Sequence, residues 1–388
     1  MLIFIQISFA LMILFENSNA QIHLNKTNLA TICNCGPMNS SSINLNYKKI
    51  ETIDPDTFKG LFSLRELKLE HNNLSSIHPT TFTGLTALLY LFLGYNKISS
   101  IDSATFKGLT SLQGLFLRNN QISSIDLATF IGLPSLEVLS LNSNQISSIY
   151  PATFKSLRFL ESLDLSYNKI SSVDPTSFTG LTSLSTLSLP SNQISSIDPT
   201  TFTGLTSLQG LYLNYNKISS IHPAAFTGLA SLGWLDLSSN QISFIAPATF
   251  KGLTSLQRLD LYSNQISSID PTTFEALTSL QILGLSSNKI SSIYPATFAG
   301  LSSLQGLWLN NNKINQIEEE LFKGLNSSTY INLESNNITS FNKNALIDLS
   351  ELNKVCLYDN PISVQFPAFL SNICSMNPNC QVYISSEC

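Results

Sequence analysis

Asparagine recurs every 24 residues along most of this chain, with no insertion between the copies. A period of that length predicts a solenoid, in which each unit packs only against its neighbours, and not a compact globule. Because recurring residues build the scaffold of such an array, function is sought where the units differ. The asparagines in register are Asn72, Asn96, Asn120, Asn144, Asn168, Asn192, Asn216, Asn240, Asn264, Asn288, Asn312, Asn336 and Asn360.

Each unit also carries a Leu-x-Leu segment, for example Leu67 to Leu69, whose alternation is typical of a short strand with one buried face. About fourteen copies run from residue 43 to residue 357. Strands at one phase of a coil stack side by side, so we expect a parallel sheet. After each strand the chain turns inward, and the Asn amide has the donors and acceptor that buried backbone groups there require. We therefore expect the asparagines to form a stacked ladder.

The second half of each unit is rich in turn-forming residues, such as Pro79 and Gly84. A Phe recurs between them, from Phe58 and Phe82 to Phe322, and predicts a buried aromatic column. The segment is too short for a long helix, so turns and brief helical pieces are expected. The predicted fold is an α/β solenoid, curved like a horseshoe, with a concave parallel sheet and a wide convex side of turns and short helices.

This pattern over residues 43–360 resembles the leucine-rich repeat family in its typical 24-residue form. About thirteen copies match at most of the repeat's fixed positions. Members of this form, such as Toll-like receptor ectodomains, variable lymphocyte receptors and Slit-like proteins, are mostly extracellular. The resemblance implies ligand binding on the concave face. It names no ligand, because one fold carries many functions.

The segments outside the array suggest export. Residues 2–15 are almost continuously apolar and lead to Ala20, which is typical of a signal peptide spanning residues 1–20. A buried N-terminal strand is the alternative, and the apolar stretch is short for a membrane span. We expect residues 21–42 to form an N-terminal cysteine-containing cap and residues 361–388 a C-terminal one. A secreted mature chain, in the extracellular space or matrix, is the resulting expectation.

The six cysteines lie only at the ends of the array, where a solenoid exposes its core and needs caps. Leucine-rich repeat proteins outside the cell close these ends with disulfides, which an oxidising compartment permits. Zinc is the competing interpretation, but the spacings match no common zinc module. Cys33 and Cys35 either pair with each other or stay reactive, since two cysteines of the family's usual N-terminal flank are missing. Two disulfides are expected, with connectivity open, among Cys356, Cys374, Cys380 and Cys388.

Five Asn-x-Ser/Thr triplets mark candidate N-glycosylation sites in an exported chain. They begin at Asn25, Asn39, Asn73, Asn326 and Asn337.

No pattern for chemistry is found. The four His form neither a metal motif nor a nucleophile–base pair, so no enzyme activity, no metal and no cofactor are expected. Asp102, Asp126 and their counterparts in other repeats form a row that could bind calcium, but Asp at this position more simply caps a turn. A protein that binds nucleic acid usually carries a stripe of basic residues. The net charge of −5 gives no reason to expect nucleic acid as a partner.

The outward positions of the predicted strands vary sharply, whereas the core positions hardly change. Aromatic and charged residues at these positions group into three patches. Exposed aromatics and Arg are typical of interfaces, although aromatics also simply suit strands. The N-terminal patch comprises Tyr90, Phe92, Tyr95, Phe116 and Arg118, edged by Lys68. The central patch comprises Tyr212, Tyr215, Trp234, Asp236, Arg258, Asp260 and Tyr262. The C-terminal patch comprises Trp308, Tyr330 and Tyr358.

These observations favour a secreted module that binds an extracellular protein or glycoprotein on its concave face. The alternative is an extracellular matrix component or non-catalytic structural subunit, valued for its rigid arc. The sequence leaves the oligomeric state open.

Overall fold

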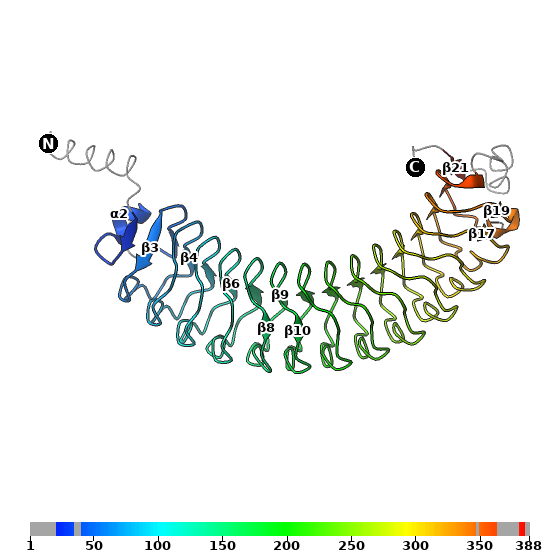
Figure 1. Ribbon diagram of the computed structural model, residues 1–388. Coiled ribbons are helices and arrows are strands. Elements are labelled where there is room, and N and C mark those ends of the chain that lie inside the picture. Colours follow the sequence, from blue (N-terminus) through cyan, green and yellow to red (C-terminus); the bar gives the residue numbers. More distant parts are fainter. Residues whose placement is uncertain (1–20, 35–39, 347–348, 363–379, 385–388) are drawn as a thin grey trace, which may run out of the picture.

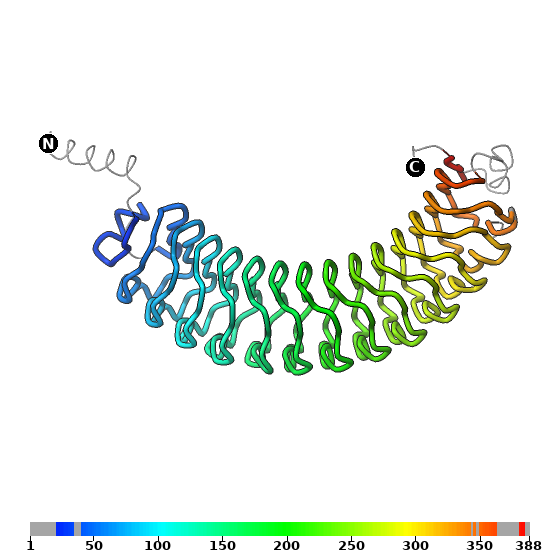
Figure 2. Tube along the Cα trace, in the orientation of Figure 1, coloured from blue at the N-terminus to red at the C-terminus, as the bar shows by residue number. Residues whose placement is uncertain are grey.

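The computed structural model describes residues 21–34, 40–346, 349–362 and 380–384. The chain winds into successive coils that together form one arc, with its two ends at opposite tips (Figures 1 and 2). Neighbouring coils are one repeat apart in the sequence. The predicted curved solenoid with a concave parallel sheet is confirmed.

A single parallel sheet of fifteen strands runs along the arc. Each strand is hydrogen-bonded to the strand of the next coil, in an order that follows the sequence. The strands are β2 (Ser42–Asn44), β4 (Glu66–Lys68), β5 (Tyr90–Phe92), β6 (Gly114–Phe116), β7 (Val138–Ser140), β9 (Ser162–Asp164), β11 (Thr186–Ser188), β12 (Gly210–Tyr212), β13 (Trp234–Asp236), β14 (Arg258–Asp260), β15 (Ile282–Gly284), β16 (Gly306–Trp308), β18 (Tyr330–Asn332), β20 (Lys354–Cys356) and β21 (Gln381–Tyr383).

Each strand is a triplet centred on an inward apolar residue. In β5, Leu91 is buried while Tyr90 and Phe92 lie on the outer side. The strand therefore begins one residue before the first Leu of the predicted Leu-x-Leu segment. The pairing is in register, so that Leu91 stands opposite Leu67 of β4 and Leu115 of β6. Equal repeat length fixes this register, because a slip of one residue would move the leucines to the solvent side.

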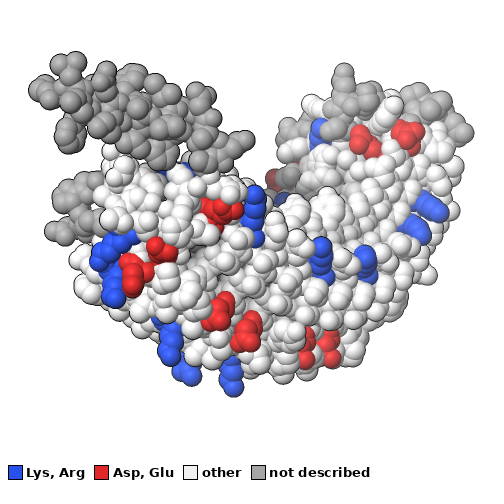
Figure 3. Space-filling view, turned by 60° about the vertical axis from the view of Figure 1, so that its left-hand side comes forward, with Lys and Arg blue, Asp and Glu red and all other residues white. Residues whose placement is uncertain are grey.

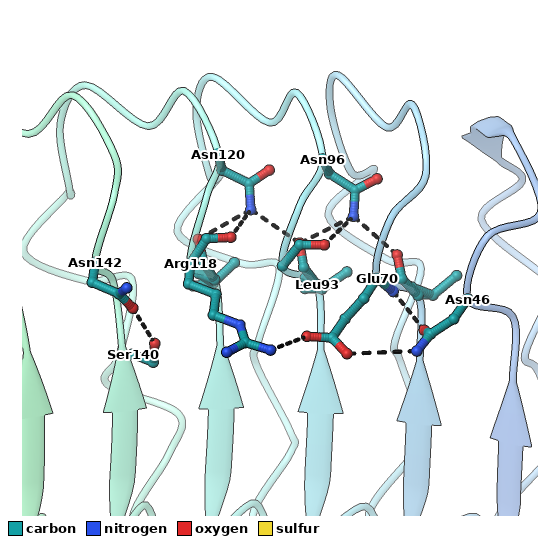
Figure 4. A network of polar contacts seen from close by, with 11 residues as sticks. Asn46, Glu70, Leu93, Asn96, Arg118, Asn120, Ser140 and Asn142 are labelled. Carbon is teal, nitrogen blue, oxygen red and sulfur yellow. Dashed lines mark hydrogen bonds and ion pairs between the residues drawn. The ribbon is translucent and has the colours of Figure 1, made fainter. Parts of the chain in front are cut away.

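The asparagine ladder forms as predicted. The Oδ1 atom of Asn96 accepts a hydrogen bond from the backbone N–H of Leu74, at 3.1 Å. Its Nδ2 donates to the carbonyl of Leu69 in the preceding coil, at 2.9 Å, and to Leu93 in its own coil, at 3.1 Å (Figure 4). The same pattern recurs at Asn120 and in later coils. One buried side chain thus satisfies backbone groups that the inward turn would leave without partners.

The predicted phenylalanine column is also present. The rings from Phe58 to Phe322 are fully buried. Phe178, for example, is stacked between Phe154 and Phe202, with ring centroids 6.3 Å away on each side. Together with the inward leucines and isoleucines, these rings form one continuous core along the arc.

The outer side of the coils consists mainly of turns. Three two-stranded parallel sheets lie apart from the main sheet: β1 (Ile22–Leu24) with β3 (Ile50–Ile53), β8 (Ser148–Ile149) with β10 (Ser172–Val173), and β17 (Gln316–Ile317) with β19 (Ser340–Phe341). Among the described residues, helix is found in α2 (Leu29–Cys33), which precedes the array, in the 3-10 turn η1 (Lys343–Leu346), and at residues 361–362 at the end of the array. The convex side therefore contains fewer helical pieces than expected, because Pro and Gly break each candidate helix.

The fifteenth strand was not predicted. β21 pairs with β20 in parallel, placing Val382 opposite Val355. Its residues fall within the predicted C-terminal cap and lack the repeat pattern, so periodicity gave no signal for them. The predicted signal peptide over residues 1–20 lies outside the described residues.

Candidate ligand-binding surface on the concave sheet

The first and third residues of every strand triplet face away from the core and line the concave side of the arc. Their side chains are therefore the part of each coil that is free to vary.

In the N-terminal patch, Phe92 and Phe116 stack almost in parallel, with ring centroids 4.6 Å apart and planes 4° apart. Tyr90 lies 6.5 Å from Phe92. The ammonium group of Lys68 sits 5.8 Å from the centre of the Phe92 ring, a cation–π arrangement. The sequence had placed these four residues together, and the structure does so.

Tyr95 lies in the turn that follows β5, beside this group, and belongs to a second stack. Its ring is 4.1 Å from His71, which in turn is 4.3 Å from Tyr47. Arg118 lies over Tyr95 at 5.2 Å. Sequence reasoning missed Tyr47 and His71. The signal for them is that both stand directly before the ladder position, as Tyr95 does.

A polar chain that spans four coils, from Asn46 to Arg118, holds Arg118 in place (Figure 4). Its Nη2 donates to Oε1 of Glu70, two coils away, at 3.2 Å. Glu70 also accepts a hydrogen bond from Asn46, at 3.5 Å. The intervening Gly94 makes this reach possible, since a Cβ there would lie 3.0 Å from Cγ of Arg118 and 3.2 Å from Oε1 of Glu70.

The central patch is an interlocked cluster. The rings of Tyr212 and Trp234 meet edge to face, with centroids 5.2 Å apart. The guanidinium of Arg258 lies 4.6 Å from the Trp234 ring. The Oδ2 atom of Asp260 accepts hydrogen bonds from Nε1 of Trp234, at 3.0 Å, and from Nε of Arg258, at 2.7 Å. Tyr212, Trp234 and Arg258 are half-buried, so the cluster presents fixed side chains.

Two carboxylates of the central patch are not exposed contacts, as the sequence had suggested, but buried supports. Asp260 is only 3 % exposed and Asp236 only 8 %. Asp236 accepts hydrogen bonds from the backbone N–H and the hydroxyl of Ser238. Burial nevertheless raises the pKa of Asp236, and burial together with that carboxylate raises the pKa of the Tyr212 phenol. Hydrogen bonding to Asp260 raises the pKa of Arg258, which therefore stays charged.

Two other predicted members of the central patch take no part in its ring stacking. Tyr215 is exposed, lies beyond β12 and makes no ring contact within the described part of the chain. Tyr262 lines a hollow together with Arg258, Asp260 and Trp308.

In the C-terminal patch, Trp308 and Tyr330 pack with centroids 5.4 Å apart. Lys354 lies over Tyr330 at 5.8 Å and over Tyr383 of β21 at 4.5 Å. Burial raises the pKa of Tyr330. Tyr358 is exposed at the end of its strand. Tyr383 was not predicted, because it lies outside the repeats.

The structure joins the central and C-terminal patches through a hollow that the sequence did not reveal. This cavity, here called the Trp308 hollow, has a volume of about 320 Å3. It is lined by Arg258, Asp260, Tyr262, Ile282, Gly284, Ser286 and Trp308. A wider groove of about 590 Å3 adjoins it and shares Arg258 and Ile282 as lining residues.

Three aromatics of the surface depend on a glycine two residues earlier. A Cβ on Gly306 would lie 2.4 Å from the Trp308 indole, and one on Gly210 would lie 3.0 Å from the Tyr212 ring. At Gly114 the corresponding distance to Phe116 is 2.8 Å. Because glycine has no side chain, each of these rings can pack flat against the sheet. The recurring sequence Gln-Gly-Leu-aromatic-Leu at these three strands is the signal that could have identified them.

The other predicted sites are only partly described. Asn326 and Asn337 are exposed, whereas Asn25 and Asn73 are half-buried; Asn39 lies outside the described residues. No free thiol is found among the described cysteines, Cys33, Cys356 and Cys380, which removes the alternative of a reactive Cys33. Cys35, Cys374 and Cys388 lie outside the described residues, so the two C-terminal disulfides stay a prediction and their connectivity stays open.

Searches for two other features gave nothing within the described ranges. No helix there is long and apolar enough to cross a membrane. No group of three or more potential metal ligands is found in the same part of the chain.

A regular parallel-sheet solenoid with an asparagine ladder, a nearly constant core and a variable concave face defines a class of proteins, the solenoids built from short repeats. The family model for the leucine rich repeat matches this chain in eight overlapping segments that together cover residues 41–362. The chain therefore belongs to the leucine-rich repeat family. No curated protein matched its sequence.

Solved structures of the same fold agree. TLR13, in a complex with ssRNA13, is 30 % identical with a TM-score of 0.67; the match covers 82 % of this chain and 49 % of TLR13. This chain thus spans about half the length of that relative. A Leptospira interrogans leucine-rich repeat protein is 25 % identical with a TM-score of 0.71, over 94 % of this chain and 100 % of that one. Drosophila Toll, in a complex with Spatzle, is 19 % identical with a TM-score of 0.76, over 86 % and 46 %, and shows the fold alone.

Proposed function

We propose that this chain is a secreted module that recognises an extracellular protein or glycoprotein on its concave sheet. The observation that carries the proposal is the cluster of Tyr212, Trp234, Arg258 and Asp260. Tyr, Trp and Arg anchor most protein interfaces, and anchors are most effective when their rotamers are already fixed. Here ring packing and the two hydrogen bonds to Asp260 fix them in advance.

A protein ligand suits this surface better than a nucleic acid does. Arg118 and Arg258 are each paired with a carboxylate, so neither is a free phosphate contact. Lys, Arg, Asp and Glu side chains are scattered, and most of the face seen in Figure 3 carries none of them. The ssRNA in the TLR13 complex is a property of that protein.

Affinity capture from extracellular fluid tests the proposal. The full mature chain is compared with a double variant, Trp234→Ala with Tyr212→Ala. The matched control is Tyr150→Ala, which removes an exposed aromatic directly after β8 and outside the main sheet. We expect a discrete partner with the wild type and the control, and at least a tenfold loss with the double variant. Equal capture by all three proteins would exclude the central patch.

The alternative, a matrix or structural subunit, predicts a different outcome. Such a protein would resist salt extraction from tissue or run as multimers in gel filtration, whereas a soluble recognition module would run as a discrete species.

A further inference from the structure

We propose that the Trp308 hollow is a subsite for a neutral sugar ring of the ligand. This inference rests on the proposed binding function and narrows its ligand to one that presents a glycan.

The shape of the hollow fits a small ring. Its volume of about 320 Å3 is at the lower end of the range of small-molecule pockets. The indole of Trp308 and the side chain of Ile282 supply apolar surface. A pyranose offers a face of C–H groups that packs on an aromatic ring, with hydroxyl groups around its edge. Trp308 is prevented from folding deeper by the sheet itself, since it already lies against Gly306.

The charges in the hollow cancel. Arg258 and Asp260, the charged groups of its wall, form an ion pair of 2.7 Å. Asp260 opposes an anionic ligand, and the guanidinium of Arg258 opposes a cationic one. A neutral ligand avoids both repulsions.

Asp260 and Arg258 each have hydrogen-bonding atoms that are not used by the ion pair between them. The Oδ2 atom of Asp260 is used twice, by Trp234 and Arg258. Its Oδ1 atom is directed at Gly284, where a Cβ would lie only 3.1 Å away. The described residues supply no hydrogen-bond donor to Oδ1, although the side chain is 96 % buried, with 4 % exposure. A sugar hydroxyl can donate to this oxygen, and can accept from the guanidinium nitrogens of Arg258 that Asp260 does not use.

The adjoining groove extends the same chemistry. Gln209, Gln257 and Gln281 line it, with Tyr212 and Trp234 beside them. Amides donate and accept equally, as hydroxyl groups require, and they carry no charge. A glycan longer than one residue can therefore continue from the hollow into this groove.

A glycan array tests the inference, using the full mature chain against immobilised neutral and acidic glycans. We expect binding to neutral glycans that falls at least tenfold with Trp308→Ala and with Gly284→Ala, which places a methyl group against Asp260 Oδ1. Tyr150→Ala is the matched control and should bind as the wild type does. Circular dichroism and thermal melting of each variant confirm folding.

Tryptophan fluorescence gives a second readout, because the chain contains only two Trp residues, Trp234 and Trp308. Trp308→Phe identifies the contribution of Trp308 by difference from the wild type. Titration of the wild type with the strongest array glycan should give a saturable shift in emission that Trp308→Phe lacks. Nα-acetyl-lysine amide, titrated in the same way, should give none.

Three results would overturn the inference. The first is that the wild type binds no glycan more strongly than Trp308→Ala does. The others are binding to acidic glycans alone and a shift in emission produced by the lysine amide. Failure of the inference is distinguishable from failure of the proposed function. The partner is captured again with Trp308→Ala, and again after its glycans have been removed enzymatically. If capture persists in both cases, the proposed binding function stands and the sugar subsite is rejected.

Discussion

The indole Nε1 of Trp234 donates a hydrogen bond of 3.0 Å to Asp260 in the adjacent coil. The same carboxylate oxygen accepts from Arg258, so one buried acid fixes the two large side chains that dominate the central patch. Part of the repeat-to-repeat variation is therefore used to hold the surface rigid.

Loss of this carboxylate should destabilise the fold locally. Asp260→Asn keeps the shape but leaves Arg258 without its ion-pair partner, and charged hydrogen bonds of this kind contribute about 1–3 kcal/mol. Urea unfolding should show a loss of that size. Arg118→Ala is the control, because its contact with Glu70 is more exposed and should contribute at most about 1 kcal/mol. Equal effects of the two substitutions would contradict the supporting role of Asp260.

The ladder predicts a larger loss at its centre. Asn168 accepts from the Ile146 N–H and donates to the carbonyls of Leu141, Leu165 and Ser166, at 3.0–3.1 Å. Asn168→Ala leaves several buried backbone groups without partners, at a cost on the order of 3 kcal/mol or more. The neighbouring Lys169→Ala alters only an exposed contact and should cost less than about 0.5 kcal/mol. Similar unfolding midpoints for the two variants would refute the ladder's contribution.

The aromatic column predicts a similar contrast. Phe178→Ala opens a cavity between two stacked rings and should lower the free energy of unfolding by about 3–5 kcal/mol. Phe159→Ala removes a ring that is 63 % exposed and should have little effect. Thermal melts of both variants provide the comparison, and a column without structural importance would give two similar curves.

The pH dependence of stability should reflect Asp236. Burial raises its pKa in the folded state, so the folded chain holds this proton more tightly than the unfolded chain does. The resulting stabilisation is fully present below the unfolded pKa and is lost as the pH rises through the folded pKa. Asp236→Asn should therefore be neutral or stabilising at pH 7, while the wild type gains relative to the variant as the pH falls. Urea titrations at a series of pH values measure this, and the opposite trend would contradict the assignment.

Gly306 should control the position of Trp308. Gly306→Ala places a methyl group 2.4 Å from the present indole position, so the ring must move, at a cost of about 1–3 kcal/mol. We expect a changed tryptophan emission spectrum. Gly233→Ala is the control, since the nearest atom to a Cβ there is 3.6 Å away. An unchanged spectrum in Gly306→Ala would show that the ring does not depend on the glycine.

The repeated features of the molecule could be predicted because each depends on local pattern. The ladder at Asn168 and the column at Phe178 follow from residues that recur at one spacing and meet their own copies in the next coil. β21 could not be predicted in this way, since Gln381 to Tyr383 lie outside the repeats and have no copy of themselves in the neighbouring strand β20.

The three patches were predicted as residue groups, but their geometry was not. The burial of Asp260 depends on how Trp234 and Arg258 fold over it, and an outward Asp is ordinarily solvated. The Trp308 hollow depends on Gly284, which lies between Asp260 and Trp308 of the adjacent strands and has no side chain to fill the space. Side-chain packing across coils, which a repeat alignment does not record, decides both.

Hydroxyl-radical footprinting of the captured complex tests most directly whether the ligand binds on the concave face. If it does, Tyr212, Trp234 and Trp308 lose reactivity on complex formation, whereas Tyr150 and Phe159, which lie outside the main sheet, keep theirs. Protection of Tyr150 and Phe159 with the concave aromatics left reactive would contradict binding at the concave sheet.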